Sequence, residues 1–112
     1  MGKFVCLYMG SPSADRGRND LSQDEIGKGM AAWTKWMSDH AKSIVDHGGP
    51  LGKTLKTSKK GVEKTSNLVA AYVIVEAESQ EAAAKMFEGH PHFSIFPGDS
   101  VEVMEVKPIP GR

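Results

Sequence analysis

Two histidines and an aspartate form the densest group of residues in this chain that suit acid–base chemistry. His90 and His92 flank a proline, and Asp99 follows shortly after them. Imidazole titrates with a reference pKa of about 6.5, which suits proton transfer near neutral pH. A neighbouring carboxylate fixes the tautomer of a histidine and raises its basicity. We therefore predict that His90 or His92 acts as a catalytic base and that Asp99 orients it.

The same cluster fits two other interpretations. Both histidines could lie on an exposed connection and pack against Phe93 and Phe96, because a motif without geometry does not establish a site. A metal site would need a third ligand, supplied by Asp99 or by a partner chain. Our prediction is acid–base chemistry with no metal and no other cofactor.

Three further side chains are candidates for binding a substrate: Tyr8, Trp36 and His40. Tyr8 would present its hydroxyl from the first predicted strand, and His40 follows Trp36 by one turn on the apolar stripe of the first predicted helix. Trp36, together with Trp33, would form an aromatic wall for a flat ligand. The alternative is that these tryptophans belong to the core or to an interface, and that His40 is a core histidine with its hydrogen bonds satisfied.

Other residue groups argue against several classes of function. Five lysines between positions 53 and 64 have no aromatic residues among them, which argues against a site for single-stranded nucleic acid. Cys6 has no base beside it in the sequence and is typical of a small buried hydrophobe. The chain has no glycine-rich phosphate loop, nucleophile elbow or cysteine-based zinc spacing.

The bulk properties indicate one soluble domain spanning residues 1–112. Basic and acidic residues balance at 14 each, so no net field attracts nucleic acid or a charged membrane. The single cysteine cannot form an intrachain disulfide, which fits a reducing cytoplasm. The apolar run after Lys3 is too short for a signal peptide or a membrane span. We expect a cytoplasmic protein.

Two apolar segments, residues 4–9 and 68–75, must position these side chains as strands. Both segments are apolar on their two alternating faces, a pattern that requires cover on both sides of a sheet. Residues 51–57 alternate weakly and predict an edge strand, and residues 101–106 predict the last strand.

Two helices are predicted between these strands. Residues 23–47 repeat apolar positions at helical spacing, after a capping box formed by Ser22 and Glu25 and before a stop at residues 48–50. Ser79 precedes a second helix over residues 80–88. Residues 90–94 read as an irregular crossing segment. Residues 10–20 form a long loop, interpreted either as a binding lid or as an ordinary surface loop.

The element order is therefore β-α-β-β-α-β, the ferredoxin-like arrangement of the α+β class. Right-handed crossovers place both helices on one face of a four-stranded antiparallel sheet. The opposite face stays apolar, and a surface of that size is rarely exposed in a monomer. We expect a second copy to cover it, which gives a homodimer in the form of a dimeric α/β barrel.

With this order in hand, the chain resembles the YCII-related family of small dimeric α/β-barrel proteins, including its DGPF-type branch. The DGPF motif itself is absent, and residues 60–65 stand in its place. The similarity covers nearly the whole chain but is spread over structural positions. The matching segments are residues 3–10, 48–52, 71–77, 81–83 and 101–103.

This resemblance implies the fold and the dimer more strongly than an activity. It implies a small-molecule pocket and, if the protein is an enzyme, a cofactor-independent lyase or isomerase acting on small rings. The alternative is a non-catalytic ligand-binding or regulatory module. The sequence does not decide whether the protein is an enzyme.

Overall fold

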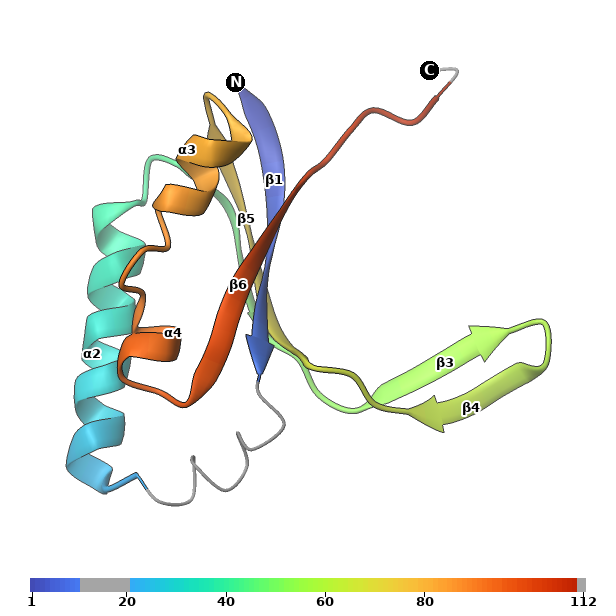
Figure 1. Cartoon of the computed structure of the whole chain (residues 1–112), viewed down its shortest axis with the longest axis horizontal. Coiled ribbons are helices and arrows are strands. Elements are labelled where there is room, and N and C mark those ends of the chain that lie inside the picture. Colours follow the sequence, from blue (N-terminus) through green and yellow to red (C-terminus); the bar gives the residue numbers. More distant parts are fainter. Residues whose placement is uncertain (11–20, 111–112) are drawn as a thin grey trace.

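The protein is described by a computed structural model that covers residues 1–10 and 21–110. Nearly all of the loop predicted at residues 10–20 therefore lies outside the described residues. In chain order (Figure 1), the elements are β1 (Gly2–Gly10), α2 (Gln23–Asp39), β2 (Ile44–Pro50), β3 (Thr54–Ser58), β4 (Gly61–Thr65), β5 (Val69–Ala77), α3 (Gln80–Lys85), α4 (Pro91–Ser94) and β6 (Gly98–Glu105).

Four strands form one antiparallel sheet in the order β2-β5-β1-β6. The described helices α2, α3 and α4 lie on the same side of this sheet (Figure 1). This arrangement confirms the predicted ferredoxin-like α+β fold. None of the described helices is long and apolar enough to span a membrane.

Strand β1 divides its side chains between the two faces of the sheet. Phe4, Cys6 and Tyr8 are buried beneath the helices, whereas Val5 and Leu7 point to the opposite face and are half-buried. The register carries this division to the neighbouring strands, because residues paired across a sheet share a face. On the uncovered face Val5 pairs with Ile74 and Met104, and Leu7 pairs with Tyr72 and Glu102. We call this surface the open face.

The core lies between the sheet and the helices. It is small, because only nine apolar side chains among the described residues are buried in it. They are Phe4, Cys6, Tyr8, Trp36, Val73, Val75, Ala77, Ala83 and Phe87.

The first helix is shorter than predicted. The capping box of Ser22 and Glu25 is present, but α2 ends at Asp39 and His40 is its C-cap. The next segment becomes the edge strand β2, in which Ile44 pairs with Val75. The helical spacing at Ile44 was misleading because an edge strand also needs one apolar residue to face the core.

The predicted glycine stop at residues 48–50 therefore lies within a strand. Gly48 has a positive φ of 61°, and a Cβ there would overlap the carbonyl of Tyr72. Glycine is required at this position because the backbone of β2 approaches β5 too closely for a side chain.

The prediction of an edge strand of the main sheet at residues 51–57 is also corrected. Their strand, β3, does not join the four-stranded sheet but pairs with β4 in a separate hairpin that extends away from the helices (Figure 1). The weak alternation and exposed lysines fit a strand, but they gave no information about its partner. The second strand of the main sheet is β2.

The C-terminal half follows the prediction more closely. Ser79 caps α3, which ends at Lys85 and continues as turns. The segment predicted to be irregular contains the one-turn helix α4, with Pro91 at its first position and His90 as its N-cap. Strand β6 begins at Gly98, earlier than predicted.

Candidate functional site

The candidate site is built around a hydrogen bond between the Tyr8 hydroxyl and Nε2 of His90, 3.3 Å apart. Nδ1 of His90 accepts a 2.9 Å hydrogen bond from the backbone N–H of His92. A neutral imidazole carries one proton. Since Nδ1 is an acceptor, the proton lies on Nε2, and His90 donates to the oxygen of Tyr8.

His92 is fixed at the end of strand β1. Its Nε2 lies 2.8 Å from the carbonyl oxygen of Met9, which can only accept, so Nε2 is the donor. The neutral ring then keeps its lone pair on Nδ1. Gly98 lies directly against this ring, because a Cβ there would overlap Cε1 and Nε2 of His92. The start of β6 therefore needs glycine to admit the imidazole.

Aromatic rings surround His90. Its ring centroid lies 4.6 Å from Trp33, 4.7 Å from Trp36 and 5.8 Å from Phe87. Tyr8 also contacts Trp33, at 4.9 Å. The side chain of His90 has no exposed area and that of Tyr8 has 1%. This packing excludes water from the Tyr8–His90 hydrogen bond.

Burial controls the protonation of both partners. It lowers the pKa of His90 from 6.5 to about 4, and the nearby His92 and His40 add a smaller effect in the same direction. Burial, with a smaller contribution from Cys6, raises the pKa of Tyr8 above its usual value. Both groups are therefore neutral at pH 7.

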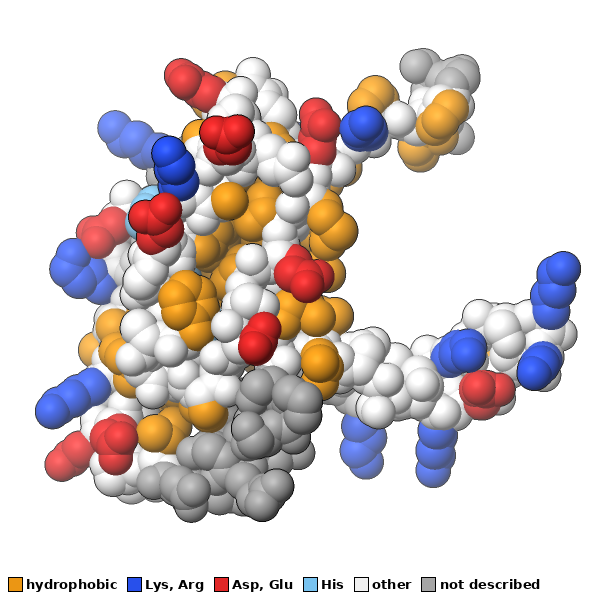
Figure 2. Space-filling model, viewed as in Figure 1, with side chains coloured by type: hydrophobic (Ala, Val, Ile, Leu, Met, Phe, Trp, Pro, Cys, Tyr) orange, Lys and Arg blue, Asp and Glu red, His pale blue; other side chains and the backbone are white. Residues whose placement is uncertain are grey.

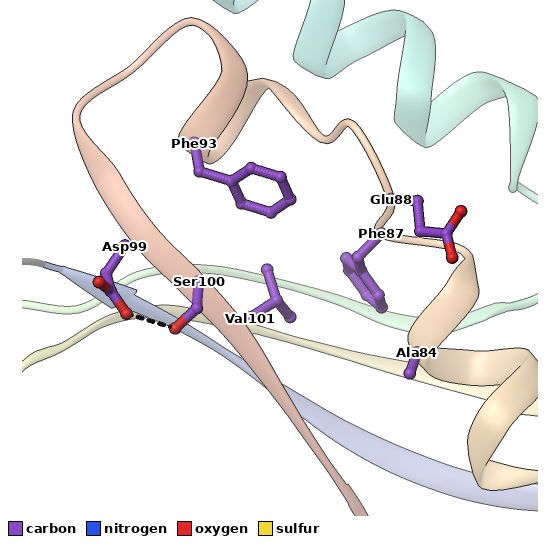
Figure 3. Close-up of a pocket in the computed structure, with 7 residues that line it drawn as sticks. All are labelled: Ala84, Phe87, Glu88, Phe93, Asp99, Ser100 and Val101. Atoms are coloured by element: carbon purple, nitrogen blue, oxygen red, sulfur yellow. Dashed lines mark hydrogen bonds between the residues drawn. The ribbon is translucent and has the colours of Figure 1, made fainter.

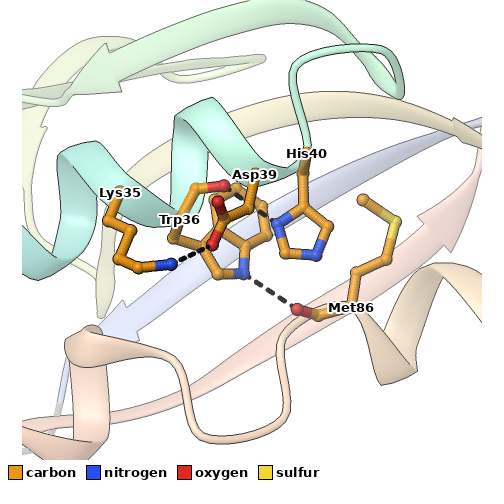
Figure 4. A network of polar contacts seen from close by, with 5 residues as sticks. All are labelled: Lys35, Trp36, Asp39, His40 and Met86. Carbon is orange, nitrogen blue, oxygen red and sulfur yellow. Dashed lines mark hydrogen bonds and ion pairs between the residues drawn. The ribbon is translucent and has the colours of Figure 1, made fainter.

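His40 packs against Trp36 (Figure 4). Its ring stacks on the indole at 4.5 Å, and its Nδ1–H donates to the carbonyl oxygen of Trp36 at 2.9 Å. The indole N–H of Trp36 donates in turn to the carbonyl oxygen of Met86 at 2.8 Å. Trp36 thereby joins α2 to the end of α3.

An open surface cavity of about 260 Å³ (Figure 3) is lined in part by Phe87, whose ring contacts Tyr8 and His90. Phe87 and Val101 form apolar walls, and the ring of Phe93 lies across from them. Its polar edge comes from the start of β6, where the hydroxyl of Ser100 donates to the carboxylate of Asp99 at 2.8 Å. Ala84 and Glu88 complete the lining.

The structure thus brings together some of the predicted site residues. His90, His92, Tyr8, Trp36 and His40 form one aromatic and imidazole cluster. Asp99 lies at the cavity instead, and among the described hydrogen bonds it joins Ser100 and neither histidine. Within the described residues, no group of three or more His, Cys, Asp or Glu side chains could hold a metal ion.

Two residues that line the cavity were missed by the sequence analysis. Phe87 was not named as a candidate, although it contacts Tyr8 and lines the cavity. Ser100 was not considered. Its position next to Asp99 on a strand gave no signal, because only the tertiary structure brings that strand end to Phe93.

Comparisons with known proteins bear on the fold. No model of a known protein family matches the chain, and no curated protein matches it. Among solved structures, the chain is similar to the 5-chloro-2-hydroxyhydroquinone dehydrochlorinase of Burkholderia phenoliruptrix AC1100, solved in complex with 2,5-dihydroxybenzoquinone. The TM-score is 0.58, with 22% identity over 94% of this chain and 93% of that chain. This likeness shows a shared fold.

Proposed function

We propose that the chain is a YCII-related cytoplasmic homodimer that binds a small hydroxylated ring compound and acts on it as a cofactor-independent lyase or isomerase. The observation that carries this proposal is the cavity between Phe87, Phe93 and the start of β6. Aromatic walls suit the faces of a flat ring, and the carboxylate of Asp99 and the hydroxyl of Ser100 suit its hydroxyl groups. At about 260 Å³ the cavity fits a small ligand.

The solved structure that shares the fold supports the ligand class. That protein is a dehydrochlorinase and was solved with a dihydroxybenzoquinone. Removal of HCl from a ring needs a base for the proton and a departing chloride, but no redox cofactor. The reaction class is therefore compatible with side chains that only bind and transfer protons.

His92 is the better of the two predicted bases. The hydrogen bonds of His90 engage both of its ring nitrogens. Of the two ring nitrogens of His92, only Nε2 makes a hydrogen bond to the described residues. The lone pair of Nδ1 is therefore left to accept a proton. In this proposal Asp99 binds a ligand hydroxyl at the cavity, and His92, which is buried behind the lining next to Phe93, receives the proton. Tyr8 and Trp36 pack behind Phe87, and His40 packs on Trp36, so these residues support the cavity wall without lining it.

The dimer is proposed from the open face. Val5, Leu7, Tyr72, Ile74 and Met104 give this face an apolar surface, with Glu102 beside Leu7, and the helices do not cover it. Replacing Leu7 with glutamate would place a second carboxylate beside Glu102 at its centre. We expect this variant to remain folded and to lose dimerisation, as measured by sedimentation velocity.

Binding is tested with 2,5-dihydroxybenzoquinone as the probe. A ligand that binds the native state raises the melting temperature in a saturable way. Asp99→Asn should weaken binding by about tenfold or more, because a hydrogen bond to a charged group contributes about 1.5–3 kcal/mol. Asp39→Asn is the matched control, since Asp39 lies on the exposed side of α2. Equal affinity of the two variants would remove Asp99 from the site.

Catalysis is tested with 5-chloro-2-hydroxyhydroquinone by measuring chloride release. The His92→Gln variant should bind the ring but release no chloride, because glutamine can donate to Met9 but is not a base. Unchanged turnover in this variant would exclude His92 as the base.

The second candidate function is a non-catalytic ligand-binding module. It is favoured by the complete burial of His90 and by the engagement of both its ring nitrogens, which together describe a structural histidine. Saturable binding of the probe without any chloride release by the wild-type protein would support this candidate over the enzyme.

A further inference from the structure

The hairpin formed by β3 and β4 stands apart from the rest of the molecule (Figure 1). We call residues 54–65 the arm. Among the described elements, its only extensive contacts are between its own two strands. The radius of gyration is 15.7 Å, whereas a compact chain of this length has a value of about 13 Å. The arm is therefore not folded back onto its own body.

One face of the arm carries two exposed apolar side chains beside Thr57 and Lys64. Thr57 pairs with Val62 and Leu55 pairs with Lys64, so Leu55 and Val62 are diagonal neighbours on the same face. Each has 67% of its area exposed. A two-stranded hairpin is only marginally stable alone in water. An arm of this kind gains stability when its apolar face packs on another surface.

The charge of the arm is opposite to that of the body. The arm carries four lysines and one glutamate, a net charge of +3, and the rest of the chain carries a net charge of −3. Figure 2 shows mainly lysines along the arm, whereas the body carries acidic and basic side chains together. Strand β6 exposes Glu102 and Glu105. A second copy of this chain therefore offers the arm a surface of complementary charge.

The direction of the arm also fits a second copy. The arm and the segment after β6 both extend on the side of the sheet opposite the helices (Figure 1). This is the side of the open face. A second copy seated there would lie between the two extensions. In a two-fold dimer each arm meets the same surface of the other protomer.

We infer that the arm of each protomer clamps a second copy of the chain, with Leu55 and Val62 packed against the partner and the arm lysines facing its carboxylates. This inference rests on the homodimer of the proposed function. It adds a second contact area, which borders the open face at Glu102 and tightens the assembly.

The apolar contact is tested with the double variant Leu55→Ser/Val62→Ser. Its control is Met30→Ser, which removes an exposed apolar side chain from α2. Sedimentation velocity over a range of concentrations gives the dimer dissociation constant. We expect the dimer dissociation constant to rise about tenfold or more in the double variant, because each protomer loses two apolar contacts with its partner. The control should leave the constant unchanged.

The charge contact is tested with Lys59→Glu/Lys60→Glu at the tip of the arm. Lys28→Glu/Lys42→Glu makes the same change in net charge on the body. The arm variant should dimerise more weakly and lose the salt dependence of the wild-type protein, because its attraction to the partner becomes repulsion. The body variant should retain a dimer as tight as that of the wild type.

Each outcome has a distinct meaning. Arm variants that dimerise as tightly as the wild type would overturn the clamp and leave the open-face dimer intact. A wild-type protein that stays monomeric at all concentrations would overturn both the clamp and the dimer. Binding of a DNA or RNA oligonucleotide that is lost in the lysine variant, with dimerisation unchanged, would reassign the arm to a polyanion. Slower amide exchange in residues 54–65 at high protein concentration would support the clamp directly.

Discussion

Tyr8 and His90 stand 82 positions apart in the chain and meet through one buried hydrogen bond. The same imidazole caps α4 by accepting from the backbone of His92. A single ring therefore connects the central strand of the sheet to the short helix that carries the proposed base. The placement of His92 depends on this connection.

Removal of the Tyr8 hydroxyl tests that connection. Tyr8→Phe keeps the ring but leaves the Nε2–H of His90 buried without a partner, which costs about 1–3 kcal/mol of stability. Urea denaturation measures the loss. Tyr72→Phe is the control, because Tyr72 lies on the open face and is partly exposed. We expect a change within about 0.5 kcal/mol for it. Equal losses in the two variants would contradict the role of the hydrogen bond.

The lowered pKa of His90 predicts a loss of stability in mild acid. The unfolded chain protonates this histidine near pH 6.5, whereas the folded protein resists protonation down to about pH 4. Between these values the unfolded state binds more protons, so stability falls as the pH falls. The full contribution, about 3 kcal/mol, is present above pH 6.5 and is lost by about pH 4.

Comparison with a variant separates the contribution of His90 to this pH dependence from those of other titrating groups. His90→Asn keeps a side-chain acceptor for the cap of α4 but does not titrate. Denaturation at pH 7 and pH 4 should show a smaller loss for this variant than for the wild type. Equal losses of stability in the two proteins would show that His90 is protonated as readily in the native state as in the unfolded state.

Two glycines in α2 predict opposite effects of the same substitution. A Cβ at Gly27 would meet no neighbouring atom, so Gly27→Ala should stabilise the protein by up to about 1 kcal/mol through helix propensity. A Cβ at Gly29 would overlap the ring of Phe96, so Gly29→Ala should destabilise it. Thermal denaturation of both variants measures the difference. A stabilising effect at both positions would show that α2 and Phe96 are not in close contact.

The thiol of Cys6 should be unreactive in the native protein. It has no exposed area, and burial raises its pKa from 9.0 to about 12, so little thiolate forms at pH 8. Labelling with a disulfide reagent should be slow without denaturant and rapid in concentrated urea. Rapid, stoichiometric labelling of the folded protein would place β1 outside the core.

The main features of the fold were predictable from local signals. Capping residues, apolar alternation and the order of elements identified the sheet and the ferredoxin-like topology. The boundary of the first helix was not predictable in the same way. Ile44 satisfies both a helical stripe and an inward-facing strand position, and only its pairing with Val75 decides between them.

The candidate site was predicted in part. His90, His92 and Tyr8 were named from residue type, and they come together in the structure. The partner of Asp99 was not predictable. Its closeness in sequence to the histidines suggested an interaction, but β6 begins at Gly98 and turns the carboxylate toward Ser100 and the cavity.

The chain leaves the sheet at the end of β2, forms the arm and returns at the start of β5. Hydrogen bonds between β2 and β5 close this junction. Beside it, the N–H of Leu51 bonds to the carbonyl of Ala70, next to the pair formed by Pro50 and Ala71. Insertions or deletions beyond this junction leave the alignment of β2 and β5 unchanged. The chain therefore offers a place where evolution or engineering can alter length, or accept a reporter sequence, without disturbing the histidines on the far side of the fold.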